Sequence, residues 1–129
     1  MFPASFDYAK ATSVADAISI LSSVDDAKLL AGGHSLLPLM KLRLASPGMI
    51  VDIGSLTDLS YIEDKGDYVA VGALTRHHDV QNSRLLKSVV PILPYVASRV
   101  GDPAVRHRGT IGGSISHGDG AMGDLRIAI

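Results

Sequence analysis

Two glycine pairs stand far apart in the sequence, and their neighbours suit both pairs to hold an anion. The two segments are Ala31-Gly32-Gly33-His34-Ser35 and Thr110-Ile111-Gly112-Gly113-Ser114. Adjacent glycines permit positive φ angles and let a ligand approach the backbone closely, so successive N–H groups can converge on a phosphate. We interpret both segments as candidate phosphate cradles. For either pair taken alone, a tight turn without a ligand is the alternative.

The first pair has the clearer local context. It follows a short apolar run, Lys28 to Ala31, that is typical of a buried strand, and it precedes a helix-like run from Leu36 to Leu44. Ser35 would then be the N-cap, next to free N–H groups and the positive end of the helix dipole. The segment has neither the P-loop pattern nor the Rossmann glycine pattern, which disfavours the common nucleotide-binding folds.

Composition limits the classes of function. The 129 residues suit one domain or two small lobes, and 12 basic against 13 acidic residues give a net charge of −1, so we expect no nucleic-acid partner. The sequence has no cysteine and therefore no ligand for an iron–sulfur cluster of its own. No run reaches the roughly 18 apolar residues of a membrane helix, so we expect no transmembrane segment and a cytoplasmic location.

The periodicity of apolar residues predicts an α+β protein with two lobes. Residues 1–54 form the first, a parallel βαβ lobe. Its expected elements are a helix over Ser13–Leu21 capped by Ser13, the strand and helix beside the first glycine pair, and a strand over Met49–Ile53.

Residues 55–129 form the second lobe, which we expect to be antiparallel. A hairpin joins Leu59–Asp64 to Tyr68–Ala73 through a turn at Lys65-Gly66-Asp67. Thr75 is expected to cap a short helix over Arg76–Gln81, and Val89–Val100 forms a helix that Pro94 shortens or kinks.

The glycine segments and their flanks resemble the FAD-binding medium subunit of carbon monoxide dehydrogenase and related molybdenum hydroxylases. The matching stretches are Ser5 to Tyr8, Ala31 to Leu44, Val51 to Ile53, Gly72 to Thr75 and Asp102 to Ser114. The resemblance implies a small parallel lobe and an antiparallel lobe that hold an extended FAD between them. It also implies that both glycine segments, residues 31–35 and 110–114, contact the pyrophosphate of FAD.

The resemblance further implies a role in electron relay. A molybdenum-bearing large subunit would oxidise the substrate, iron–sulfur clusters of a small subunit would carry the electrons, and FAD would pass them to an external acceptor. No residue of this chain is then expected to be catalytic. A flavin subunit of a xanthine- or aromatic acyl-CoA-oxidising relative, or a remnant that no longer holds flavin, is the alternative.

The sequence departs from the family's pattern near its end. The stretch from His117 to Arg126 lacks the expected prolines, so we include neither Asp119 nor Asp124 among the site residues. Family members run to more than twice this length. We therefore expect a truncated or frameshifted reading frame whose antiparallel lobe is incomplete, which binds FAD weakly and can self-associate.

The other ionisable clusters carry less chemistry. His77-His78-Asp79 and the pair His117 and Asp119 contain metal-ligand types, but no third cluster has matching spacing, so we expect solvated surface residues and no metal site. The run Arg106-His107-Arg108 either lends positive potential toward the pyrophosphate or an adjoining subunit, or is a solvated loop.

Overall fold

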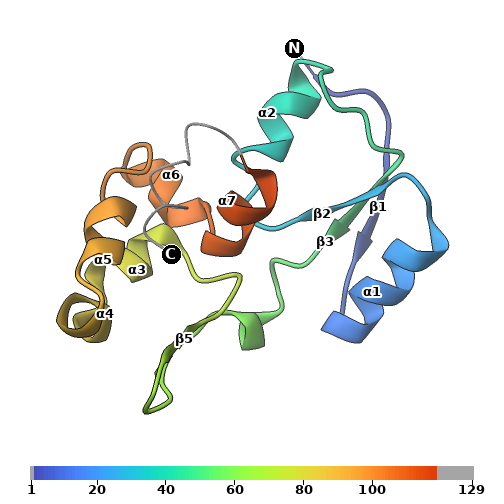
Figure 1. The fold of residues 1–129 in the computed structure, drawn as a ribbon. Coiled ribbons are helices and arrows are strands. Elements are labelled where there is room, and N and C mark those ends of the chain that lie inside the picture. The colour runs from blue at the N-terminus through green and yellow to red at the C-terminus, as the bar shows by residue number, and fades with distance from the viewer. Residues whose placement is uncertain (1, 119–129) are drawn as a thin grey trace. The chain divides into compact units, whose positions relative to one another are not determined.

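A computed structural model describes residues 2–118 of the chain. The chain divides into two compact units, Met1–Thr57 and Asp58–Ile129. A parallel sheet with helices forms the first unit, and an antiparallel strand pair with helices forms the second, so the predicted α+β class is confirmed (Figure 1). Asp119 and Asp124 lie outside the described residues.

The first unit is built on a three-stranded parallel sheet. Its strands are β1 (Asp7–Lys10), β2 (Ala27–Leu30) and β3 (Met49–Asp52), in the order β1-β3-β2. Tyr8 and Lys28 both pair with Ile50 of the central strand. Ile50 and Val51 of β3 are fully buried, as a central parallel strand requires. The strand β1 is an addition to the elements expected from the sequence.

Helix α1 (Val14–Ser23) packs against β2 and β3, and its start follows the predicted capping pattern. The hydroxyl oxygen of Ser13 accepts a hydrogen bond from the N–H of Asp16 at 3.0 Å, and the carboxylate of Asp16 accepts one from the N–H of Thr12 at 2.9 Å. The two bonds satisfy the N–H groups of Asp16 and Thr12 at the helix start. Ala17 then joins Ala11 and Val51 in the core of the unit.

The second unit begins with the predicted hairpin. After a short 3-10 helix at Thr57–Leu59, strands β4 (Ile62–Asp64) and β5 (Val69–Val71) pair antiparallel. Gly66 takes a φ of +89° in the turn, where its N–H donates to the carboxylate of Asp64 at 2.9 Å. The N–H of Gly72 donates to the carbonyl of Tyr61 at 2.9 Å, so the pairing extends past the strand ends.

Five short helices complete the second unit. They are α3 (His77–Asn82), α4 (Arg84–Val89), α5 (Ile92–Ala97), α6 (Pro103–Arg108) and α7 (Ile111–His117). Helix α3 packs against α5 and α6, and α4 packs against α5. The core of the unit comes from α3, α4, α5 and α7, with the buried residues Val80, Leu86, Leu93, Ala97 and Ile111.

Three expectations about these helices were wrong. The predicted helix over 89–100 is shorter than its expected bounds: it is α5, with Pro91 as the N-cap and Pro94 buried within it, and the helix before it, α4, was not predicted. Thr75 does not cap α3; its hydroxyl instead donates to the backbone carbonyl of Tyr61 at 3.0 Å. The run 106–108 is no loop but the end of α6.

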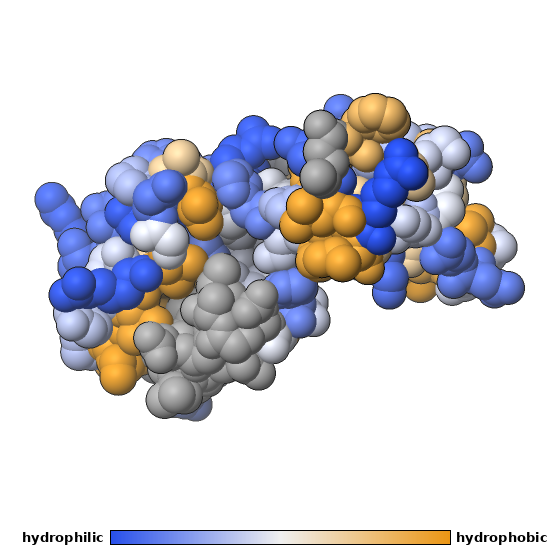
Figure 2. Space-filling model, turned by 90° about the horizontal axis from the view of Figure 1, so that it is seen from above, coloured by the Kyte–Doolittle hydropathy of each residue, from blue (hydrophilic) through white to orange (hydrophobic). Residues whose placement is uncertain are grey.

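Large apolar side chains reach the surface of both units. Figure 2 shows one face of the molecule, on which hydrophobic residues are orange. The exposed apolar side chains include Ile18, Leu42 and Leu44 in the first unit and Val89, Ile92 and Ile115 in the second. Within residues 2–118, none of the helices has the length and apolar character needed to cross a membrane.

Candidate functional site

The first glycine segment connects β2 to helix α2 (Leu36–Lys41) through a left-handed backbone at Gly33. The φ of Gly33 is +82°, a region that other residues rarely adopt. A Cβ atom at this position would lie 2.9 Å from Cδ1 of Leu37 and 3.4 Å from Cδ1 of Leu30. The backbone conformation therefore favours glycine at position 33, and a Cβ there would also displace the end of the Leu37 side chain.

Five consecutive backbone donors are unbonded in this segment. The N–H groups of residues 32–36 find no acceptor among residues 2–118, and the first N–H that does so is that of Leu37, which donates to the carbonyl of Gly33 at 3.1 Å. His34 is exposed, and the other members of residues 31–36 are partly buried. Free N–H groups at the start of a helix are the usual ligands of an anion.

The side chain of Ser35 does not take the predicted capping role. Ser35 is the N-cap of α2, but its backbone is already helical, with φ −106° and ψ −48°, and its hydroxyl makes no capping bond. A capping hydroxyl needs an extended residue that points it back at the N–H groups two and three positions on. The helix α2 is also shorter than expected, because it ends at Lys41 rather than Leu44.

The carboxyl end of β3 lies beside this segment and holds a hydrogen-bonded pair, Asp52 and Tyr8, that sequence reasoning missed. Asp52 accepts hydrogen bonds from the N–H of Gly54 at 2.8 Å and from the phenol of Tyr8 at 2.5 Å. The bond to the Asp52 carboxylate, with smaller effects of burial and of its negative charge, raises the pKa of Tyr8. Neighbouring parallel strands end at one sheet edge, so Asp52 at the end of a predicted strand was the available signal.

The second glycine segment is not a turn with positive φ but the first turn of helix α7. Thr110 is the N-cap, and its hydroxyl oxygen accepts from the N–H of Gly113 at 3.0 Å. The N–H of Ile111 donates to Thr75 at 3.0 Å, that of Gly112 to Ala73 at 2.9 Å, and that of Ser114 to Thr110 at 3.1 Å. The predicted convergence of free N–H groups is therefore wrong for residues 111–114.

A close approach of two backbones explains the glycine at position 112. A Cβ atom there would lie 2.6 Å from the carbonyl oxygen and 2.7 Å from the Cβ of Ala73. Such separations are shorter than any van der Waals contact, so only glycine lets α7 begin against the chain that follows β5.

Ser114 in this segment contacts a buried histidine. The Nε2 atom of His77 lies 2.8 Å from the hydroxyl oxygen of Ser114, and His77 is 1% exposed. Burial lowers the pKa of His77 to about 4, so the imidazole is neutral near pH 7. The expectation that residues 77–79 are solvated was therefore wrong for His77, because the first turn of α3 faces the core.

Three basic residues near this region, His78, Arg106 and His107, make local contacts. The His78 and His107 rings stack with centroids 3.9 Å apart, and Arg106 donates to the carbonyl of Gly101 at 3.1 Å. Basic residues at the end of α6 also complement its dipole. Within residues 2–118, no three His, Cys, Asp or Glu side chains form a group that could hold a metal ion.

Comparison with known proteins identifies the family. The sequence model of the family described as the FAD binding domain in molybdopterin dehydrogenase matches residues 4–129. The chain belongs to this family. Its members hold FAD, which agrees with the expected cofactor.

Relatives of the FAD-binding domain are medium subunits of several dehydrogenases. The glyceraldehyde dehydrogenase medium chain of Sulfolobus acidocaldarius is 43% identical over 129 residues, which is all of this chain and 46% of the relative. A solved structure of carbon monoxide dehydrogenase from Hydrogenophaga pseudoflava, lacking the Mo-pyranopterin moiety of its molybdenum cofactor, is 46% identical with a TM-score of 0.90. The match covers 92% of this chain and 42% of that one.

The crystal structure of quinoline 2-oxidoreductase from Pseudomonas putida 86 is also similar, with a TM-score of 0.88 and 38% identity over 92% of this chain and 42% of that chain. The chain thus spans less than half the length of the relatives it matches. The resemblance to the carbon monoxide dehydrogenase medium subunit is confirmed.

The two segments fit FAD to different degrees. The unbonded N–H groups of residues 32–36 suit the diphosphate, and the conformation of Gly33 turns the chain between strand and helix as such a cradle needs. In residues 110–114 the backbone donors of 111–114 are already bonded, so the hydroxyl groups of Thr110 and Ser114 carry the hydrogen-bonding capacity of this segment.

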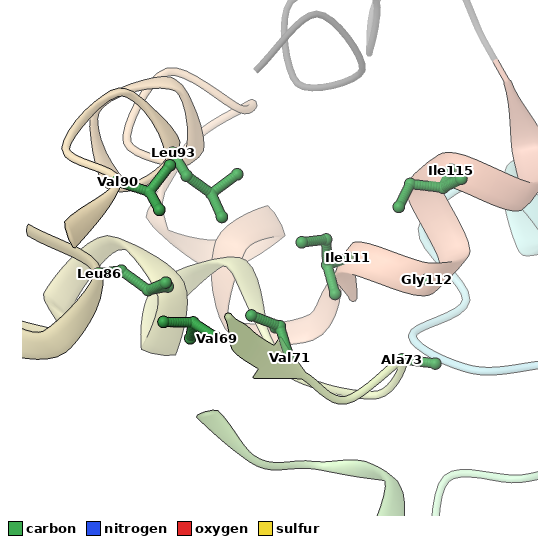
Figure 3. A pocket seen from close by; sticks show the side chains of 9 residues that line it. All are labelled: Val69, Val71, Ala73, Leu86, Val90, Leu93, Ile111, Gly112 and Ile115. Atoms are coloured by element: carbon green, nitrogen blue, oxygen red, sulfur yellow. The ribbon is translucent and has the colours of Figure 1, made fainter. Parts of the chain in front are cut away.

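An apolar pocket adjoins the second glycine segment within the second unit. Figure 3 shows side chains from β5, α4, α5 and α7 around this cavity of about 440 Å³. It is lined by Val69, Val71, Ala73, Leu86, Val90, Leu93, Ile111, Gly112 and Ile115. Gly112 therefore packs against Ala73 and also lines the pocket. Sequence reasoning missed this cavity, since apolar side chains on separate short helices give no motif.

Proposed function

We propose that this chain holds the diphosphate of FAD in a medium subunit that relays electrons from iron–sulfur clusters to an external acceptor. The observation that carries the proposal is the row of five unbonded N–H groups at residues 32–36, in a chain of an FAD-binding family. Bound FAD supplies the redox chemistry of this relay.

The residues of the chain bind and orient the cofactor and have no proposed catalytic step. The N–H groups after β2 hold the diphosphate, and Gly33 gives the backbone its curvature. Thr110 and Ser114 contribute hydroxyl groups rather than N–H groups. Ala31 precedes the row of free donors, and the N–H of His34 is one of its members. Ile111 and Gly112 fix the start of α7 through their bonds to Thr75 and Ala73.

The proposed partners are an iron–sulfur small subunit and a molybdenum-cofactor large subunit. The chain has no cysteine, so clusters in such an assembly would be held by another subunit. Relatives are medium chains named for different reactions, on glyceraldehyde and carbon monoxide among others, which supports a large subunit as the place where the substrate is selected. A xanthine- or aromatic acyl-CoA-oxidising assembly is the alternative substrate class, and self-association of the chain stays a prediction.

A binding comparison between two flavins tests the proposal. FAD and riboflavin share the isoalloxazine ring, but only FAD carries the diphosphate that the N–H groups would hold. Titration of the purified chain, followed by flavin fluorescence, is expected to show FAD binding at least tenfold more tightly than riboflavin. Equal affinity for the two flavins, or no binding of FAD, would contradict the proposed site.

A further inference from the structure

His77 contacts the chain around the second glycine pair at two points, through its backbone at Gly109 and through its imidazole at Ser114. The backbone N–H of His77 donates to the carbonyl of Gly109 at 3.1 Å, and a Cβ atom at Gly109 would lie 3.0 Å from the ring carbon Cδ2. The ring then reaches Ser114 through Nε2 at 2.8 Å. Because the side chain is 1% exposed, the direction of this hydrogen bond depends on the protein alone.

The unpaired nitrogen of the ring decides which tautomer is favoured. The Nδ1 atom is buried and has no hydrogen-bond partner within residues 2–118. If Ser114 donated to Nε2, the neutral ring would carry its hydrogen on Nδ1 and bury an unpaired donor. If Nε2–H donates instead, Nδ1 is only an unpaired acceptor. Unpaired buried N–H groups are rarer than unpaired acceptors, so the second arrangement is favoured.

This direction leaves the hydrogen of the Ser114 hydroxyl group available. Three other serines in or next to helices donate their hydroxyl hydrogen to a carbonyl one turn earlier: Ser22 to Ile18 at 2.8 Å, Ser23 to Ile20 at 3.0 Å, and Ser98, the C-cap of α5, to Tyr95 at 2.5 Å. The described part of the chain offers the Ser114 hydroxyl no such acceptor. Ser114 thus differs from these three serines, because it accepts from His77 while its own hydrogen is uncommitted.

We propose that His77 is a positioning residue for FAD: its Nε2–H donates to the Ser114 hydroxyl oxygen and so presents the hydroxyl hydrogen to an oxygen of the FAD diphosphate. The inference rests on the proposed function. It explains how a segment whose N–H groups at 111–114 are already bonded still offers a donor to an anion. It also gives a use to a buried polar side chain whose second nitrogen has no partner.

The tautomer is read directly by NMR without any flavin. In protein labelled with ¹⁵N-histidine, His77→Gln assigns the signals of His77 by removing them. We expect Nε2 to show the shift and coupling of a protonated ring nitrogen and Nδ1 those of a bare one. A protonated Nδ1 would overturn the inference, whether or not the chain binds FAD.

The consequence for the ligand is tested with matched serine variants. Ser114→Ala removes the proposed donor, and Ser98→Ala removes the hydroxyl group of the α5 C-cap in the same unit, which is committed to a carbonyl. We expect Ser114→Ala to weaken FAD binding about tenfold and Ser98→Ala to leave it within twofold, measured by fluorescence quenching. Equal affinities of the two variants would overturn the inference.

Two substitutions at position 77 distinguish a role of His77 in positioning Ser114 from a role in packing alone. The amide of His77→Gln can still donate to Ser114, whereas His77→Phe fills the space without a donor. We expect the glutamine variant to bind FAD more tightly than the phenylalanine variant, with thermal unfolding recorded for both. If neither folds, the serine pair and the NMR signals still decide. A parent chain that does not distinguish FAD from riboflavin would instead contradict the proposed function.

Discussion

The two glycine segments share a sequence pattern but differ in what their glycines do. At Gly33 the backbone is left-handed, and the N–H groups of residues 32–36 are unbonded. At Gly112 and Gly113 the backbone is helical, and the N–H groups donate to Ala73 and Thr110. A glycine pair can thus reflect either a conformational need or a close approach of two backbones. Only the first kind supplies free backbone donors for an anion.

The largest expected effect comes from adding a side chain where the two backbones meet. In Gly112→Val, the new Cβ would lie 2.6 Å from the carbonyl oxygen of Ala73, so α7 must move off the hairpin. We expect the free energy of unfolding to fall by about 3 kcal/mol in urea denaturation. Ser116→Ala, at an exposed position of the same helix, is the control and is expected to change little. Equal stability of both variants would show that the contact with Ala73 is not tight.

Acid is expected to destabilise the unit that contains the second segment. Burial lowers the pKa of His77 from 6.5 to about 4, so the unfolded chain binds more protons than the folded one between these values. The neutral ring contributes fully to the free energy of unfolding above pH 6.5, and this contribution is lost as the pH falls toward 4. We expect a loss of about 2 kcal/mol in the free energy of unfolding on going from pH 7 to about 4.5.

Two histidine variants isolate this effect. His77→Gln cannot gain a proton in this range and should flatten the pH dependence of unfolding. His77→Phe also lacks a group that gains a proton in this range, so it should flatten the dependence in the same way. A parent whose stability is the same at pH 7 and pH 4.5 would show that His77 is not buried as a neutral ring.

The first segment is expected to respond mainly in flavin binding. Gly33→Val places a branched side chain at a φ of +82° and against Leu37, which should distort the row of N–H groups. We expect FAD affinity to fall at least tenfold, with riboflavin affinity nearly unchanged, in fluorescence titrations. Gly113→Val, whose new Cβ would meet the capping hydroxyl of Thr110 at 2.8 Å, is a matching test of the second glycine segment. Parental FAD affinity in both variants would remove the glycine segments from the site.

The smallest predicted change concerns the cap of α7. Thr110→Val keeps the shape of the side chain but removes the hydroxyl that accepts from the N–H of Gly113 at 3.0 Å. We expect a loss of about 1 kcal/mol in the free energy of unfolding. Thermal unfolding of Thr110→Ser should restore most of this loss, because serine supplies the same acceptor. An unaffected Thr110→Val variant would mean that the cap bond contributes nothing.

Local patterns predicted much of the first unit and less of the second. The strands β2 and β3, the capped helix α1 and the hairpin of β4 and β5 follow from apolar periodicity and turn residues, and the structure confirms them within one to three residues at most ends. Helix α7 could not be found in this way, since Gly112 and Gly113 have poor helix propensity. Contacts with Ala73 and Thr75, more than thirty residues earlier in the chain, decide its conformation.

The site was also predictable only in part. The glycine at position 33 and its free N–H groups agree with a cradle after a parallel strand, which is a local pattern. The burial of His77 depends on how α3 meets α6 and α7, and the neighbouring His78 in the same helix is only partly buried. One residue along a helix turns a side chain by about 100°, so adjacent histidines can have opposite environments.

Hydrogen exchange of individual amides tests the central claim most directly. The account predicts that the amides of residues 32–36 exchange rapidly in the free chain, because they lack acceptors within residues 2–118, and slow at least tenfold when FAD is added. The amides of residues 111–114 should already be protected without flavin and change little. Amides of residues 32–36 that exchange at the same rate with and without saturating FAD would contradict the account.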